Sequence, residues 1–183
     1  MTRRVVGLQA VELGESPWGK APRPKGAKAL GLRFERAVGK ALPGALHGQW
    51  LKFVDNNGKG FCQPDILFSP RPGVLCVVEC KLTDTMEAEG QLKHLYMPLV
   101  GKLFDGELRP IIVVKYLSPF TQPSRIVGSW DEALAHPSPI LHAFSKRELA
   151  PPKGGVFPPE FSRSCFHYSE ADSLPHRAIP PTP

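Results

Sequence analysis

Two short apolar runs in the middle of the chain predict a β-hairpin. Residues 66–68 are apolar, residues 69–73 are rich in turn formers, and residues 74–81 begin with a second apolar run. Runs of this length, bounded by proline and glycine, are typical of paired strands. A further apolar run at 108–116 follows a helical segment, so it predicts a buried strand that is reached by a crossover and joins a mixed sheet.

The segment before this hairpin predicts another reversal of the chain. Large residues alternate over 50–55, and Asn56-Asn57-Gly58 is typical of a tight turn that leads back through 61–63. Lys59 follows this turn between two glycines, which would let its backbone approach a phosphate closely. We therefore expect Lys59 to contact a nucleic-acid substrate. The alternative is a hairpin tip whose glycines serve the turn alone.

Three segments have the residue pattern of helices. Residues 30–42 carry an apolar stripe that is flanked by Glu35, at the edge of the predicted buried face. Residues 85–97 carry a second stripe, and Gln91 lies on its inward side. The stretch Ser129-Trp130-Asp131-Glu132 resembles a capping box that opens a short helix through His136.

Together these elements predict an α/β protein with a mixed central sheet flanked by helices. The length of 183 residues and the 42% hydrophobic content suit one core with tails. We expect a flexible basic arm over residues 1–26 and one domain over residues 27–148. The proline-rich extension over residues 149–183 would wrap the domain or a partner subunit in an extended form.

Charged side chains gather at the end of the second hairpin strand. Because side chains alternate along a strand, Glu79 and Lys81 share one face with Val77, and Cys80 lies on the other. A charge at the end of an apolar face is costly unless it is paired or bound to a metal. Asp65 precedes the first strand and would lie across from Glu79, so that two carboxylates of the kind Mg²⁺ binds come together. An ordinary hairpin with a solvated charged face is the alternative.

The pair Pro64-Asp65 followed by Glu79-Cys80-Lys81 resembles the motif of the PD-(D/E)XK nuclease superfamily. The resemblance covers residues 30–117 and implies a restriction-endonuclease-like core that hydrolyses nucleic-acid phosphodiesters with Mg²⁺ or Mn²⁺. It implies that Asp65 and Glu79 bind the metal, that the main-chain carbonyl of Cys80 completes the shell, and that Lys81 orients and activates the water. Glu35, on the preceding helix, would supply a further ligand.

The predicted helix after the lysine adds a candidate. In the RecB-like exonuclease branch of this superfamily, a glutamine followed by a tyrosine on this helix supports the active site. Gln91 and Tyr96 look similar, with a separation one residue longer than the usual pattern. Gln91 is therefore a candidate for the active site, and a partly buried glutamine bonded to backbone groups is the alternative.

A second branch, the phage and archaeal-type Holliday-junction resolvases, is short, basic and built on the same order of residues. That order is present here as Glu35, Asp65, Glu79 and Lys81. This resemblance implies a structure-specific endonuclease that cuts branched DNA. A resolvase cuts two symmetry-related strands, so we also expect a homodimer. The alternatives are a RecB-like exonuclease and a nucleic-acid-binding module that has lost the chemistry.

The charge balance is compatible with a polyanionic partner. The formal net charge is +6 and the isoelectric point is about 9.3. Basic residues in the predicted arm would give sequence-independent, salt-sensitive affinity for DNA, unless the arm is only a solvated terminus. The candidates in this arm are Arg3, Arg4, Arg23, Lys25 and Lys28.

Other chemistries find less support in the sequence. The four cysteines lack the paired spacing of zinc sites, so we expect free buried thiols in a reducing cytosol. Gly101-Lys102 is followed by Leu103, so no Walker-type phosphate loop is present. The pattern shows no membrane span and no secretory signal. We expect a cytoplasmic protein, or one in the host cytoplasm if it is encoded by a phage.

Overall fold

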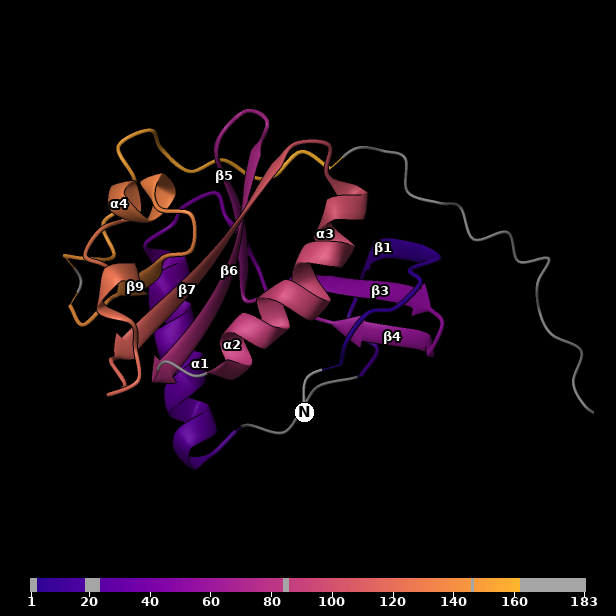
Figure 1. Cartoon of the computed structure of the whole chain (residues 1–183), viewed down its shortest axis with the longest axis horizontal. Coiled ribbons are helices and arrows are strands. Elements are labelled where there is room, and N and C mark those ends of the chain that lie inside the picture. Colours follow the sequence, from indigo (N-terminus) through magenta and orange to yellow (C-terminus); the bar gives the residue numbers. More distant parts are fainter. Residues whose placement is uncertain (1–2, 19–23, 84–85, 146, 162–183) are drawn as a thin grey trace, which may run out of the picture.

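Two sheets organise the chain, which a computed structural model describes over residues 3–18, 24–83, 86–145 and 147–161. The larger sheet has six strands in the order β2-β5-β6-β7-β9-β8, and the smaller sheet has the order β1-β3-β4 (Figure 1). The strands are β1 (Ala10–Gly14), β2 (Leu46–His47), β3 (Trp50–Asp55), β4 (Gly58–Cys62), β5 (Ile66–Arg71), β6 (Val74–Thr83), β7 (Glu107–Tyr116), β8 (Ile126–Val127) and β9 (Ile140–His142).

The larger sheet is mixed, as the sequence predicts. Strands β5 and β6 form the predicted antiparallel hairpin, whose turn contains Gly73 at a φ of 75°. Strand β7 pairs with β6 in parallel, and β9 pairs with β7 in parallel. The hairpin differs from the prediction in one detail. Strand β5 continues to Arg71 through a bulge after Phe68, where the sequence suggests a turn.

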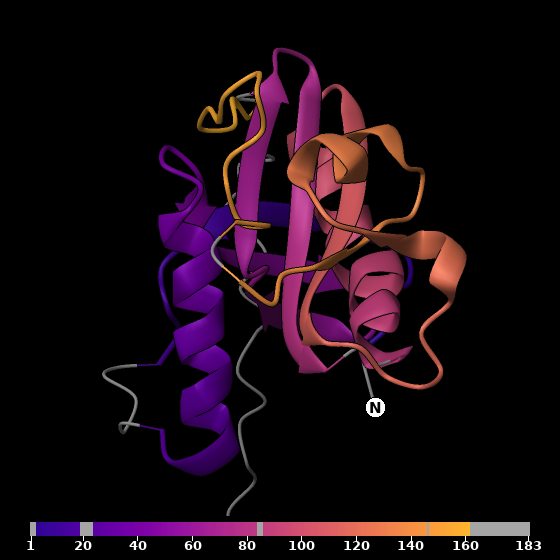
Figure 2. The same cartoon turned by 90° about the vertical axis from the view of Figure 1, so that its left-hand side faces the viewer.

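Helices cover both faces of the larger sheet (Figure 2), and the buried side chains between the layers form two apolar cores. On one face, α1 (Gly26–Lys40) and α4 (Trp130–Ala135) bury side chains such as Phe34, Val38 and Trp130 against Val78 of β6. On the other face lies a long helix that shares its core with both sheets. The fold is therefore an α/β arrangement in which the six-stranded sheet is the middle layer.

The long helix runs from Met86 to Leu103 and contains a π-helical stretch. Its parts are α2 (Met86–Gln91), the π segment η1 (Leu92–Tyr96) and α3 (Met97–Leu103). The Met97 N–H donates to the carbonyl of Leu92, five residues back. The helix therefore continues beyond the predicted end at residue 97.

Pro98 links this helix to the start of the chain. Proline has no N–H, so the carbonyl of His94, four residues earlier, lacks its usual α-helical partner. The N–H of Val5 donates to that carbonyl at 3.0 Å. The helix thus holds the N-terminal segment through the His94 carbonyl, which has no helical donor because Pro98 lacks an N–H.

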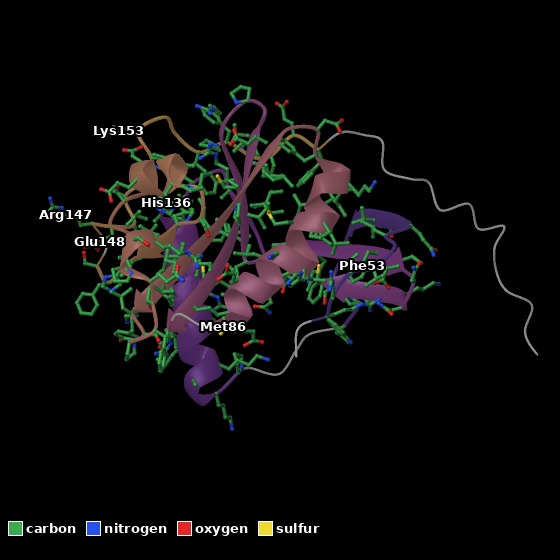
Figure 3. The ribbon with its side chains drawn as sticks, in the orientation of Figure 1. Phe53, Met86, His136, Arg147, Glu148 and Lys153 are labelled. Atoms are coloured by element: carbon green, nitrogen blue, oxygen red, sulfur yellow. The ribbon has the colours of Figure 1, made fainter. Side chains whose placement is uncertain are left out.

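The N-terminal segment belongs to the smaller sheet. The sequence predicts a flexible arm over residues 1–26, but Ala10–Gly14 forms β1, which pairs with β3 along its whole length. The inner face of this sheet, including Phe53, packs against the long helix (Figure 3). The prediction failed because the contacts that hold this segment are distant in sequence.

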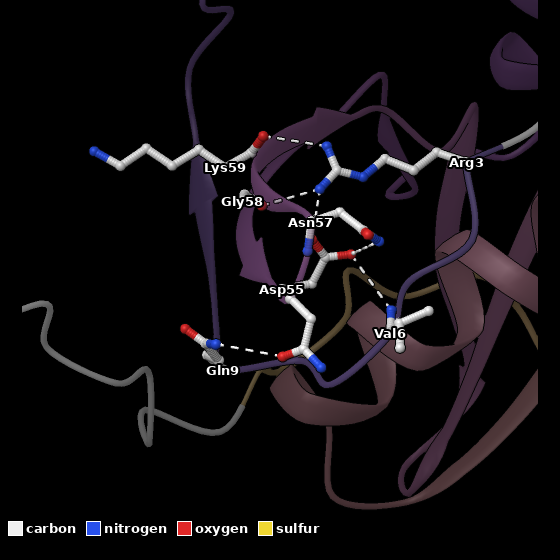
Figure 4. A network of polar contacts seen from close by, with 8 residues as sticks. Arg3, Val6, Gln9, Asp55, Asn57, Gly58 and Lys59 are labelled. Atoms are coloured by element: carbon white, nitrogen blue, oxygen red, sulfur yellow. Dashed lines mark hydrogen bonds and ion pairs between the residues drawn. The ribbon is translucent and has the colours of Figure 1, made fainter.

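Arg3 fastens the same segment to the β3–β4 turn (Figure 4). Its guanidinium forms an ion pair with the buried carboxylate of Asp55 at 2.6 Å and lies 4.7 Å from the centre of the Phe53 ring. Burial by itself raises the pKa of Asp55. The hydrogen bonds from Arg3, Val6 and Asn57 outweigh that effect, so the pKa lies below its ordinary value.

Residues 147–161 run along the domain through two turns, in which the Ala150 N–H donates to the Arg147 carbonyl and the Gly155 N–H donates to the Pro152 carbonyl. Phe157 forms an antiparallel bridge with Ser69 of β5, in which each backbone N–H donates to the other carbonyl at 2.9 Å. This bridge covers the end of β5 that the short strand β2 leaves unpaired. No helix in the described residues is long and apolar enough to cross a membrane.

Candidate active site at the β5–β6 hairpin

Asp65 and Glu79 meet across the hairpin, as the alternation of side chains predicts. Ile66 pairs with Val78, which places Asp65 opposite Glu79 at the next position of the ladder. The Asp65 Oδ2 accepts a hydrogen bond from the Cys80 N–H at 2.7 Å. This contact closes the hairpin at the end that carries the charges, so the two carboxylates are held by backbone geometry.

Lys81 lies beside Glu79 on the same face of β6. Its ammonium is 2.7 Å from Glu79 Oε1, and the Glu79 side chain is only 3% exposed. The second carboxylate oxygen, Oε2, is buried without a hydrogen-bond partner. A buried oxygen of this kind is costly unless a cation or donor approaches it. Glu79 therefore offers one oxygen to Lys81 and one to a ligand.

Glu35 approaches this cluster from α1. The charges of Asp65 and Lys81 act on its carboxylate, and Glu35 in turn acts on Glu79. Gly39, one turn further along α1, packs against the imidazole of His47, and a Cβ there would come within 2.6 Å of that ring. This close approach brings α1 against the edge of the sheet, near the hairpin.

Gln91 and Tyr96 lie on the helix that covers the same face. The amide oxygen Oε1 of Gln91 is buried and has no hydrogen-bond partner. Because π-helical hydrogen bonds join residues five apart, the π segment brings Tyr96 onto the turn that follows Gln91. Burial raises the pKa of the Tyr96 hydroxyl most. The negative charges of Glu79 and Asp65 raise it further, because this hydroxyl lies close enough to both carboxylates to feel their charge.

The sequence pattern left the role of Tyr96 open because its separation from Gln91 is one residue longer than in the RecB-like pattern that it resembles. The signal that would have helped is Pro98, since a proline inside a helical pattern indicates an irregular turn nearby. The structure thus adds Tyr96 to the candidate site.

The electrostatics of the cluster disfavour several charged carboxylates at once. Burial, followed by the charge of Asp65, raises the pKa of Glu35 to about 7. The same two causes raise the pKa of Glu79, although Lys81 partly offsets them. Burial also raises the pKa of Asp65, although the hydrogen bond from the Cys80 N–H and the charge of Lys81 lower it in part. A cation bound among these groups would relieve both the repulsion and the burial cost.

The donor set suits a hard divalent cation such as Mg²⁺. Two carboxylates from a rigid hairpin, together with water, are typical magnesium ligands, and Glu79 Oε2 is a buried oxygen in need of a partner. No group of three His, Cys, Asp or Glu side chains within the described residues is arranged to hold one ion. Asp65 and Glu79 are therefore the protein ligands that the geometry supports best, and the structure does not bring the predicted ligand Glu35 into one group with them.

The structure uses the Arg3 guanidinium and the Lys59 carbonyl, from two of the predicted DNA-contacting residues, in internal contacts. The guanidinium of Arg3 is engaged by Asp55 and by the carbonyls of Gly58 and Lys59, so it is a structural residue. Gly60 lets the Phe53 ring and Arg3 pack over β4, since a Cβ there would come within 2.4 Å of the ring. Gly60 therefore serves this packing, Gly58 serves the turn at a φ of 91°, and the Lys59 carbonyl accepts a hydrogen bond from Arg3.

The other basic candidates are exposed or not described. Arg4 is exposed, and Lys25 and Lys28 are exposed at the start of α1. Arg23 lies outside the described residues. Of the cysteines in the described part of the chain, Cys62, Cys76 and Cys80 are free thiols, as expected.

Comparison with known proteins adds no relative. The chain matches no known family model, no curated protein and no solved structure. The functional argument for this site therefore rests on its own geometry and chemistry.

Proposed function

We propose that this chain is a Mg²⁺-dependent deoxyribonuclease of the PD-(D/E)XK type with a restriction-endonuclease-like core. The observation that carries the proposal is the arrangement of Asp65, Glu79 and Lys81 at the closed end of a buried hairpin. Two carboxylates with raised pKa values beside a lysine are more typical of a catalytic centre than of a solvated hairpin face.

Each residue has a distinct role in this proposal. Asp65 and Glu79 hold Mg²⁺, with Glu35 and the Cys80 carbonyl as candidate additional ligands, and Mn²⁺ would substitute. When bound, the metal would supply Lewis-acid stabilisation of charge on the phosphate. The Lys81 ammonium, held in place by Glu79, would orient the attacking water and offset negative charge as it develops. Gln91 would position groups around the centre through its buried amide.

The preferred substrate is branched DNA, such as a four-way junction. The order Glu35, Asp65, Glu79 and Lys81 resembles that of small Holliday-junction resolvases, and the basic charge suits recognition of DNA shape. We propose a homodimer that acts in DNA recombination or phage DNA processing. The free thiols are compatible with a reducing cytoplasm.

Cleavage of a labelled four-way junction, beside linear duplex and single strand, tests this proposal. We expect wild-type protein with Mg²⁺ to make paired, symmetric cuts, and Asp65→Asn to make none. Asparagine keeps an oxygen for the Cys80 N–H, so the hairpin should survive. Asp105→Asn, on an exposed residue, is the matched control and should cut normally.

Other outcomes separate the alternatives. Metal-dependent cutting confined to DNA ends would indicate an exonuclease. No metal-dependent cleavage of any substrate, with DNA binding intact, would indicate a binding module and would overturn the nuclease proposal.

A RecB-like exonuclease is the second candidate, because a specific observation favours it. The π segment places Tyr96 near the carboxylates although its separation from Gln91 is one residue longer than usual. An exonuclease would digest linear DNA and leave a covalently closed circle intact, whereas the endonuclease would cut the circle once a branched structure is present.

The proposed dimer has a test of its own. Size-exclusion chromatography with light scattering at micromolar protein concentration should give twice the 20.1 kDa mass of the chain. A monomer that still makes paired cuts in a junction would remove the dimer from the proposal.

A further inference from the structure

Aromatic side chains gather on the outer face of the smaller sheet. Trp50 of β3 and Phe61 of β4 lie on the face opposite the buried Leu51 and Cys62. The Trp18 ring contacts both, with ring centres 5.2 Å from Trp50 and 6.2 Å from Phe61. Trp18 is 62% exposed and Phe61 is 41% exposed. We call these three residues the aromatic platform.

Such a platform is unusual on an exposed sheet face unless it binds something. Aromatic rings normally bury most of their area, and exposed groups of them mark binding surfaces. The opposite face of the same sheet already packs on the long helix, so the platform is not needed to complete the core. The outer face also carries a pocket of about 270 Å³, whose lining includes Glu12, Lys52, Lys59 and Phe61.

The charge around the platform favours an anionic ligand. Lys52 lies across from Phe61 in the sheet register, and the Lys59 side chain extends away from the Arg3 network (Figure 4). Lys52 is partly balanced by Glu12, at 3.6 Å.

The platform is joined directly to the candidate active site. Strand β4 leads from Phe61 to Asp65 in four residues, a span of at most about 14 Å. The Gly48 N–H donates to the Asp65 carbonyl at 3.0 Å, and Gln63 donates to the Gly48 carbonyl, so the start of β3 is held to the same segment. A strand bound on the platform would therefore run within a few nucleotides of the hairpin carboxylates.

We infer that the aromatic platform binds unpaired nucleotides of single-stranded DNA beside the site of cleavage. Bases of any sequence stack on aromatic rings, while lysines and arginines follow the phosphates. This inference rests on the proposed function in taking DNA as the ligand. It adds that the substrate is engaged through an unpaired segment, such as the open centre of a branch or a single-stranded flank.

Tryptophan fluorescence in EDTA tests binding without cleavage. Of the three tryptophans, Trp130 is 1% exposed, so Trp18 and Trp50 should carry any response to ligand. We expect a thymidine oligonucleotide to quench the wild-type emission. The double variant Trp18→Phe/Trp50→Phe should keep binding, measured by anisotropy of a labelled oligonucleotide, but its emission should no longer respond.

Alanine variants measure the contribution of each ring. Trp50→Ala and Phe61→Ala should each raise the dissociation constant about 5- to 50-fold. Phe157→Ala, which removes a ring of similar exposure at the far end of β5, should leave it unchanged. Near-ultraviolet circular dichroism from the buried Trp130 reports whether each variant is folded.

The outcomes separate this inference from the proposed function. Oligonucleotide binding that leaves the wild-type emission unchanged, or equal loss in Phe157→Ala, would overturn the platform. Emission that changes with protein concentration alone would also overturn it, because the face would then bury a second copy of the chain. Platform-dependent binding without cleavage of any DNA would support the platform and overturn the nuclease, and junction cleavage without single-strand binding would do the reverse.

Discussion

The two oxygens of the Glu79 carboxylate have different environments. One forms an ion pair with Lys81, and the other is buried without a partner. Glu35 and Asp65 add negative charge nearby, so ionisation of this group of carboxylates opposes folding unless a cation is bound. Stability, pH and metal should therefore be linked at this site.

The direction of the pH dependence follows from the raised pKa values. The pKa of Glu35 rises from 4.5 to about 7, and that of Glu79 also rises. Protonated carboxyls favour the folded state, so their contribution is complete below pH 4.5 and is lost as the pH rises through 7. In EDTA, we expect the thermal midpoint to fall between pH 5 and pH 8, and Mg²⁺ to raise it more at pH 8 than at pH 5.

Glu79→Gln should flatten this dependence and reduce the effect of Mg²⁺, because the uncharged amide neither repels Asp65 nor binds a cation well. Differential scanning fluorimetry across the pH range provides the measurement. Glu160→Gln, on an exposed residue, is the control and should follow the wild type. An equal Mg²⁺ response in Glu79→Gln would show that the cation binds elsewhere.

At this scale the sequence predicts the catalytic candidates better than their surroundings. Strand alternation is enough to place Glu79 and Lys81 on one face, and the hairpin brings Asp65 opposite them. Strand alternation does not predict the ion pair of Arg3, because its partner Asp55 lies 52 residues away in the sequence. A contact over that distance leaves no local pattern.

At the scale of elements, the π segment decides which side chains face the hairpin. A regular α-helix advances 100° per residue, so residues five apart would point in different directions. The π segment takes up one extra residue, and the buried positions Ala88 before it and Leu99 after it remain in one core.

Removal of one exposed residue should convert this stretch into regular α-helix. We expect a chain lacking Lys93 to keep the core positions of α3 in place and to unfold at a midpoint at or above that of the wild type. Thermal unfolding by circular dichroism gives the midpoint, and DNA cleavage tests whether the site is retained.

Deletion of Arg36, an exposed residue in the regular helix α1, is the matched control. That deletion rotates Val38 and Leu42 away from their core and should destabilise the protein strongly. If the two deletions destabilised the protein equally, the π segment would not be a place where the helix accommodates one residue more than a regular α-helix needs.

The sequence predicts the long elements and misses the short ones. Strands β6 and β7 are ten residues long, each contains an uninterrupted apolar stretch, and both are found where expected. Strands β2 and β8 are two residues long, and only pairing with β5 and β9 makes them strands. Strand β1 has a mixed composition, and its partner β3 is 36 residues further along.

At the scale of the whole molecule, the N-terminal segment joins the long helix to the smaller sheet. Val5 bonds to the long helix, β1 pairs with β3, and Arg3 closes the β3–β4 turn. Arg3→Ala would leave the buried Asp55 carboxylate without its cation. We expect a loss of about 2 kcal/mol in the free energy of unfolding, measured by urea denaturation.

Arg4→Ala removes the same charge from an exposed neighbour and should change the stability little. If both variants behaved alike, the effect would come from net charge and not from the ion pair with Asp55.

The pairing of β1 with β3 also has a consequence for the order in which the protein folds. The β5–β6 hairpin joins residues that are close in sequence, whereas β1 must close a loop of 36 residues or more before it gains any contact. As an edge strand with a mostly exposed outer face, it should also be among the first elements to open in the native state. Amide hydrogens of β1 should then exchange with deuterium well before those of β6, so the hairpin carboxylates would remain assembled while the strand beside the aromatic platform detaches and returns.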